Sequence, residues 1–192
     1  YVAWRLGDPT ARALGRLSLN PLPHIDPVGL LVFVITSLSG SFVFGWAKPV
    51  PIDPRYFASP RKGMMWVALA GPMTNFFLAV CFALLLRGSI TLFPTFFLEQ
   101  HPAAILFGRA CYAGVFINLG LGWLNLIPVP PLDGSRIVAY FLPARQCATY
   151  MQIERYGFLV LLLLLIFGLL DTVLRPLVFG SADALLSLLQ LR

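Results

Sequence analysis

The 192-residue sequence predicts an all-α fold, a multi-pass transmembrane helical bundle with a short extended segment near the membrane. Hydrophobic residues make up 58% of the chain and charged residues only 11%, whereas a water-soluble domain carries about 25% charged residues. Several apolar runs also approach the roughly 20 residues that a helix needs to cross a bilayer. We therefore expect a lipid bilayer around the chain and treat residues 1–192 as a single membrane-embedded domain.

Four apolar segments are candidate membrane-spanning helices. The first contains serines and a glycine at its centre, so it either spans the bilayer or forms a re-entrant hairpin with both ends on one side. A fifth, shorter segment near the C-terminus is expected to lie along the membrane interface. In chain order the five segments are residues 28–46, 64–86, 103–126, 156–174 and 177–191.

The net charge of +6 is distributed as in a membrane protein. Lys and Arg occur in residues 47–63 and 127–155, whereas residues 88–102 contain neither. Positive charge marks cytoplasmic connections, so the first two stretches are expected inside and the third outside. The basic residues form no patch interleaved with aromatic side chains, which argues against a nucleic-acid partner.

The segment FGWAKPVPIDPRYF, residues 44–57, is expected to be extended. Its three prolines exclude a helix, and Val50 alternates with Ile52 as in a strand. Such a segment presents unpaired N–H and C=O groups, with which a second strand can pair.

The segment NLIPVPPLDG, residues 125–134, is expected to break a helix at membrane depth. Three prolines end the helix, and Gly134 permits close approach of the backbone beside Asp133. A broken helix at this depth lines a cavity or is buried in protein, which makes Asp133 a candidate functional residue. Its carboxylate could ligate a metal, act as a base or pair with an arginine. Alternatively, it could cap the N-terminus of the helix that follows.

Polar residues inside the apolar segments are further candidates. Asn118 and Asn125 are two helical turns apart, and in AGPMTN the small Gly71 precedes Asn75 by one turn, so each pair shares a helix face. Packing against a neighbouring helix is one reading, and contact with a substrate or an oxyanion is the other. We expect His24 to be a hydrogen-bonded structural residue rather than a ligand.

These motifs resemble those of a known family. NLIPVPPLDG resembles the Asn-x-x-Pro-x-Pro-x-Leu-Asp-Gly signature of the site-2 protease family of intramembrane zinc metalloproteases. LNPLPHIDPVG, FGWAKPVP and AGPMTN are similar to the accompanying blocks of its compact, mostly bacterial branch, which lacks a PDZ domain. The blocks follow in the right order from Tyr1 to about Tyr156.

The resemblance implies a zinc metalloendopeptidase that cuts transmembrane segments of membrane-protein substrates, located in the bacterial cell membrane. It implies that Asp133 is a Zn²⁺ ligand, and that Asn75 and Asn125 contact the substrate backbone or the oxyanion. The residues expected to pair with the extended substrate are Lys48, Pro49, Val50, Pro51 and Ile52.

The His-Glu-x-x-His motif that completes the zinc site of the family is absent from residues 1–192. In the family this motif precedes a sequence like that at Tyr1, so we expect the zinc-binding helix upstream of residue 1. Residues 1–192 are expected to be inactive alone, since one carboxylate does not hold catalytic zinc. The alternative is an inactive pseudoprotease, a membrane scaffold that binds transmembrane partners through the same groove. The sequence indicates no oligomeric state.

Overall fold

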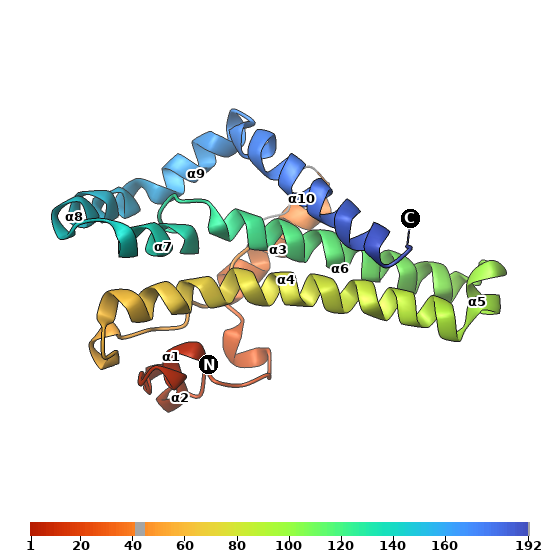
Figure 1. Cartoon of the computed structure of the whole chain (residues 1–192), viewed down its shortest axis with the longest axis horizontal. Helices are drawn as coiled ribbons and strands as arrows, with labels where there is room; N and C mark the ends of the chain where they lie inside the picture. Colours follow the sequence, from red (N-terminus) through yellow and green to blue (C-terminus); the bar gives the residue numbers. More distant parts are fainter. Residues whose placement is uncertain (41–44, 192) are drawn as a thin grey trace. The chain divides into compact units, whose positions relative to one another are not determined.

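The computed structural model describes residues 1–40 and 45–191 (Figure 1). Apart from one isolated antiparallel bridge between Ile25 and Ala47, the described part of the chain has no β-structure, which confirms the all-α prediction. Three short 3-10 turns are Leu22–His24, Pro54–Tyr56 and Ile153–Tyr156. The helices are α1 (Val2–Arg5), α2 (Thr10–Ala13), α3 (Pro27–Ser39), α4 (Pro60–Leu92), α5 (Pro94–Leu98), α6 (Pro102–Leu126), α7 (Asp133–Phe141), α8 (Ala144–Gln152), α9 (Gly157–Ile166) and α10 (Leu169–Leu188).

The chain divides into two compact units, Tyr1–Met64 and Met65–Arg192, which are described separately. In the first unit, α3 begins at an Asp26 N-cap, whose Oδ1 accepts hydrogen bonds from the amides of Val28 and Gly29. The helix ends at Gly40, whose φ of +70° suits a glycine that terminates a helix.

The second unit is built on the antiparallel helices α4 and α6, which are joined by α5 (Figure 1). Helix α10 lies along α6 and completes the packing. Small side chains form much of the contact, because they let membrane helices approach closely. The fully or nearly fully buried cluster consists of Ala79, Ala83, Val115, Leu119 and Ala182.

Aromatic rings on α4 fit against glycines on α6. A Cβ atom added to Gly122 would lie 2.6 Å from Cε1 of Phe76, and one added to Gly114 would lie 2.6 Å from Cγ of Phe82. These two contacts fix the register of the helix pair, so that residue 76 is level with residue 122. A hydrogen bond from Nε1 of Trp123 to the Ser181 hydroxyl, 3.2 Å long, ties α6 to α10.

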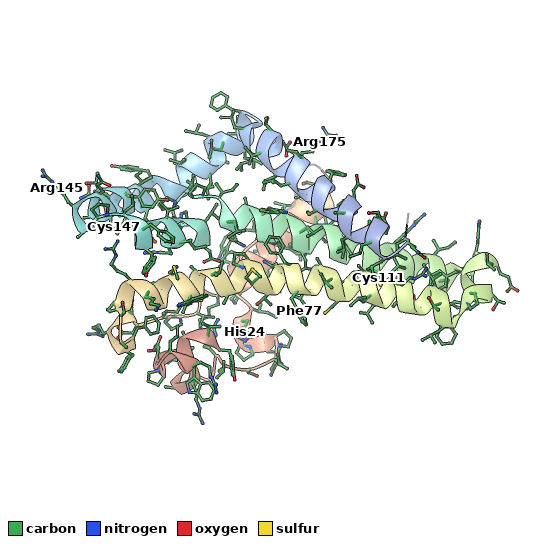
Figure 2. All side chains as sticks on the ribbon, viewed as in Figure 1. His24, Phe77, Cys111, Arg145, Cys147 and Arg175 are labelled. Carbon is green, nitrogen blue, oxygen red and sulfur yellow. The ribbon has the colours of Figure 1, made fainter. Side chains whose placement is uncertain are left out.

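Two helices in the described residues, α4 and α6, are long and apolar enough to cross a membrane, and a third span results if the bent pair Ala144–Tyr156 and Leu159–Ile166 is counted as one. At 1.5 Å per residue, the 33 residues of α4 extend about 50 Å, which exceeds the bilayer's hydrocarbon thickness of about 30 Å. Phe77 on α4 is 66% exposed, as expected of a side chain that faces lipid (Figure 2).

The structure corrects the predicted boundaries of three apolar segments. In the first segment the described helix, Pro27–Ser39, has only 13 residues, about 20 Å, which is too short to span, and residues 41–44 lie outside the described part. The predicted span at residues 156–174 is broken at Gly168, whose φ is +67°. The predicted tail, residues 177–191, is therefore mostly the second half of α10 rather than a separate helix.

Candidate functional site

The turn from α6 to α7 is where the three prolines predicted a break. Helix α6 ends at Leu126, and α7 starts seven residues later. Pro130 is fully buried, and the Tyr150 hydroxyl donates a 2.7 Å hydrogen bond to the Pro128 carbonyl. The predicted helix break is confirmed, and α8 holds the turn in place through Tyr150.

Glycines let this turn pack closely against its neighbours. A Cβ atom added to Gly134 would lie 2.2 Å from the Leu126 carbonyl oxygen and 2.5 Å from that of Ile127. One added to Gly157 would lie 2.2 Å from the Pro130 carbonyl oxygen. Any larger residue would clash with backbone at both positions, so the predicted close approach at Gly134 is confirmed.

Asp133, the first residue of α7, lies against Gly71 of α4. A Cβ atom added to Gly71 would lie 2.8 Å from Oδ2 of Asp133. The absent side chain at Gly71 thus makes room for the carboxylate. Gly71 permits the close approach predicted for it, and the structure brings the motifs AGPMTN and NLIPVPPLDG together.

Two of the roles considered for Asp133, capping the N-terminus of α7 and pairing with an arginine, find no support in its contacts. The residue at the N-cap position of α7 is Leu132, and no side chain caps this helix. The nearby Arg136 pairs instead with Glu154, at 2.6 Å. Among the described residues Asp133 has no hydrogen-bond or ion-pair partner.

Asn75 and Asn125 lie at the same end of the α4–α6 pair as Asp133. Because residue 76 is level with residue 122, helical rise places Asn75 and Asn125 within about 3 Å of each other along the helix axis. Asn75 is half-buried and has no hydrogen-bond partner in the described part of the chain.

Asn118 and Asn125 do not bridge helices, contrary to the packing reading. Their Nδ2 atoms donate to carbonyls one turn earlier in α6, to Gly114 at 2.8 Å and to Leu121 at 2.9 Å. Each such bond uses one of the two N–H donors of the amide and leaves the second N–H and the Oδ1 atom available to another partner.

The predicted substrate-pairing segment lies in the first unit and is held firmly at its start. The Lys48 amide donates to the His24 carbonyl at 2.9 Å, next to the Ile25–Ala47 bridge. Arg16, which is only 9% exposed, donates from Nη2 to the Lys48 carbonyl at 2.7 Å. Lys48, Pro49, Val50 and Pro51 are exposed and Ile52 is half-buried, so the edge between the anchors faces outward.

Asp8 holds the other end of the same segment. Its side chain is fully buried, and Oδ2 accepts a 2.9 Å hydrogen bond from the Asp53 amide. Oδ1 accepts from the amide and hydroxyl of Thr10. Burial acts to raise the pKa of Asp8, but the hydrogen bonds from Thr10 and Asp53 outweigh it, and the net pKa is below the usual value.

His24 is structural, as predicted. Its Nε2 lies 3.1 Å from the Ser18 carbonyl oxygen, and its Nδ1 lies 3.4 Å from Nη2 of Arg16. Since an arginine can only donate, the arrangement assigns the proton to Nε2 and the acceptor role to Nδ1. Both ring nitrogens are engaged with protein atoms.

A complete metal site is not formed by the described residues. They contain no group of three His, Cys, Asp or Glu side chains that could hold a metal ion. The unpartnered carboxylate of Asp133 suits one ligand position, but a catalytic zinc takes three protein ligands. The described residues therefore do not fit a zinc ion by themselves.

Comparison with known proteins agrees with the motifs. The model of peptidase family M50 matches residues 88–168. The chain is 38% identical over 190 residues to "Putative zinc metalloprotease YwhC" of Bacillus subtilis, covering 98% of this chain and 82% of that protein. No solved structure matches the chain.

Two further relatives are matched over less of their length. The chain is 31% identical to "Putative zinc metalloprotease Rip2" of Mycolicibacterium smegmatis, over 95% of this chain and 66% of that protein. It is 34% identical to "Putative zinc metalloprotease MJ0611" of Methanocaldococcus jannaschii, over 58% of this chain and 51% of that protein. The match to most of YwhC shows the family, and the long apolar helices and the turn at Asp133 agree with it. The chain belongs to peptidase family M50, the site-2 protease family.

Proposed function

We propose that this chain forms the membrane-embedded part of an intramembrane zinc metalloendopeptidase, which cuts transmembrane segments of membrane-protein substrates in the cell membrane. The observation that carries the proposal is Asp133, a half-buried carboxylate without a partner among the described residues, at the start of α7 in the turn that follows the candidate spanning helix α6. The prolines and glycines that position Asp133 also interrupt the helix. Such an interruption around an ionisable side chain is expected where the side chain has a function rather than a packing role.

Zn²⁺ is the proposed cofactor, with Asp133 as one of its ligands. When bound, zinc supplies an activated water and polarises the scissile carbonyl. Two further protein ligands are required, and they are not among the described residues. The proposal therefore concerns the full-length protein, and the described residues are expected to be inactive alone.

Asn75 and Asn125 are the proposed contacts to the substrate backbone or the oxyanion. Their common level at the Asp133 end of the helix pair supports this role, as does the amide of Asn75, which is unpaired within the described part of the chain. An amide that donates to developing negative charge contributes about 10²–10³ in kcat. Neither residue is needed to bridge α4 and α6, so both amides can serve a substrate.

Lys48, Pro49, Val50, Pro51 and Ile52 are the proposed template for the substrate. A transmembrane helix must unwind before its peptide bond can be attacked, and an exposed extended segment can pair with the unwound chain. Anchors at Lys48 and Asp53 hold this segment at both ends. A rigid template lowers the conformational entropy that binding must overcome.

The test is a cleavage assay on the full-length protein in liposomes, with a fluorogenic transmembrane peptide as the probe. We expect cleavage that stops when zinc is chelated and returns when zinc is restored. Cleavage that is indifferent to chelation would contradict the metalloprotease, and so would the lack of any cleavage by zinc-loaded protein across a panel of peptides.

A non-catalytic scaffold is the second candidate, favoured by the absence of a three-ligand group from the described residues. It would bind transmembrane partners through the same segment without cutting them. Photocrosslinking from position 50 distinguishes the two candidates. With zinc-loaded full-length protein, a scaffold gives the same yield of crosslinks to intact partner at every time of irradiation, whereas with the protease the yield falls at later times because the partner has been cut.

A further inference from the structure

A pocket of about 630 Å³ lies at the α5 end of the second unit, away from Asp133. It is an open pocket lined by the end of α4, by α5, by the start of α6 and by the residues that follow α10. Its walls are largely apolar, with Leu86, Ile90, Phe97 and Ile105 among them. Two arginines, Arg87 and Arg109, also line it.

The two arginines come from different helices but lie at one level. The contact between Phe82 and Gly114 puts residues 82 and 114 level in this antiparallel pair, and Arg87 and Arg109 each lie five residues from them toward α5, so the two arginines are level. Arg87 directly follows the apolar run 64–86, and Arg109 lies near the start of the apolar run 103–126. Both guanidinium groups thus belong at the depth where hydrocarbon gives way to lipid headgroups.

No acidic side chain in the described part of the chain neutralises these two charges. The ion pairs found there, Arg55–Asp53 and Arg136–Glu154, lie elsewhere. Arg87 contacts only the neutral Gln190, through a 3.4 Å hydrogen bond from Nη2 to Oε1, and Arg109 has no described partner. Two cations that line one pocket near a membrane boundary repel each other, and an anion bound in the pocket relieves that repulsion.

We propose that this pocket binds one anionic phospholipid, with its phosphate between Arg87 and Arg109 and an acyl chain along the apolar wall. Guanidinium groups bind phosphate oxygens through paired N–H donors, and basic pockets between membrane helices recognise anionic headgroups. The apolar walls favour a lipid over a free phosphate ion, because they would gain nothing from a small, fully hydrated ligand. The site is independent of the proposed protease activity.

The test is native mass spectrometry of the full-length protein, titrated separately with phosphatidylglycerol, phosphatidylcholine and glycerol 3-phosphate. We expect one phosphatidylglycerol to bind specifically. Replacing both arginines, in Arg87→Gln/Arg109→Gln, should weaken its binding about 30-fold, at roughly fivefold per charge. Arg175→Gln is the matched control, since Arg175 is exposed on α10 outside the pocket and should leave binding unchanged (Figure 2).

A second variant fills the pocket without changing its charge. The Cβ of a residue at 108 meets only ordinary contact distances, so Gly108→Leu should fold and should also weaken phosphatidylglycerol binding. Phosphatidylcholine binding equal to that of phosphatidylglycerol would overturn the proposal, as would comparable binding of glycerol 3-phosphate. Equal losses in the double variant and in Arg175→Gln would also overturn it, because they would indicate only a general effect of surface charge.

Discussion

A methyl group added at Gly71 would press on Asp133. The 2.8 Å separation between that Cβ and Oδ2 is too short for contact, and the mobile atom is the end of the carboxylate rather than backbone. Gly71→Ala should therefore displace the carboxylate with little loss of stability, since alanine also favours the helix by up to about 1 kcal/mol. We predict a lower zinc content in the full-length variant, measured by atomic emission.

The matched control for this variant is Gly88→Ala, on the same helix. A Cβ atom at residue 88 meets no atom within 4 Å. The control should retain the zinc content of the unmodified protein. Equal zinc in both variants would mean that the position of the Asp133 carboxylate does not matter for metal binding.

A substitution at Gly134 is expected to lower stability, unlike one at Gly71, because the atoms that surround Gly134 belong to the backbone. At 2.2 Å from the Leu126 carbonyl oxygen, a new Cβ in Gly134→Ala forces the end of α6 and the start of α7 apart. Overpacking of this kind costs about 1–3 kcal/mol in the free energy of unfolding. We expect a lower thermal midpoint by circular dichroism in detergent.

Gly120→Ala on α6 is the control for Gly134→Ala, since a Cβ atom there meets open space. Its midpoint should equal or exceed that of the unmodified protein. If the two variants melt alike, the tight contact between α6 and α7 is not present in solution.

At the scale of the element, the extended segment depends on the ionised state of Asp8. Its folded pKa lies below the unfolded value of about 3.9, so its stabilising contribution is complete above roughly pH 5, where both states are ionised, and is lost as the pH falls through the folded pKa. We predict faster hydrogen exchange in residues 45–59 at acid pH, after correction for intrinsic rates. Asp8→Asn should show fast exchange already at neutral pH, since a hydrogen bond to a charged group stabilises by about 2 kcal/mol.

Asp171→Asn provides the comparison for Asp8→Asn. Asp171 is exposed on α10, and its replacement should leave exchange in residues 45–59 unchanged. An acid-induced loosening that persists unchanged in Asp8→Asn would assign the pH dependence to another group.

The elements predicted best from the sequence are those set by local chemistry. Prolines 128, 130 and 131, three within four residues, end α6, and the long apolar runs of α4 and α6 predict helices from composition alone. The break at Gly168 was not predicted, because a single glycine within an apolar run is compatible with a continuous helix. The left-handed conformation of Gly168 accompanies the packing of α10 on α6, which the local sequence does not reveal. The helical part of residues 28–46 was overestimated for a similar reason, since apolar composition does not reveal where a helix ends.

The anchors of the extended segment could not be predicted from the sequence. Asp8 bonds to a residue 45 positions away and Arg16 to one 32 positions away. The local sequence indicates only that Asp8 and Pro9 end a helix. It gives Arg16 no role beyond that of a basic residue near the membrane. Long-range hydrogen bonds leave no periodic pattern, so only the folded chain reveals them.

At the scale of the whole molecule, the central claim is that Asp133 holds zinc. The most direct test is the zinc content of the purified full-length protein, compared with that of Asp133→Ala and of the control Asp171→Ala. The account predicts about one zinc per chain in the unmodified protein and the control, and a marked loss in Asp133→Ala. Unchanged zinc in Asp133→Ala, or no zinc in the unmodified full-length protein, would contradict it.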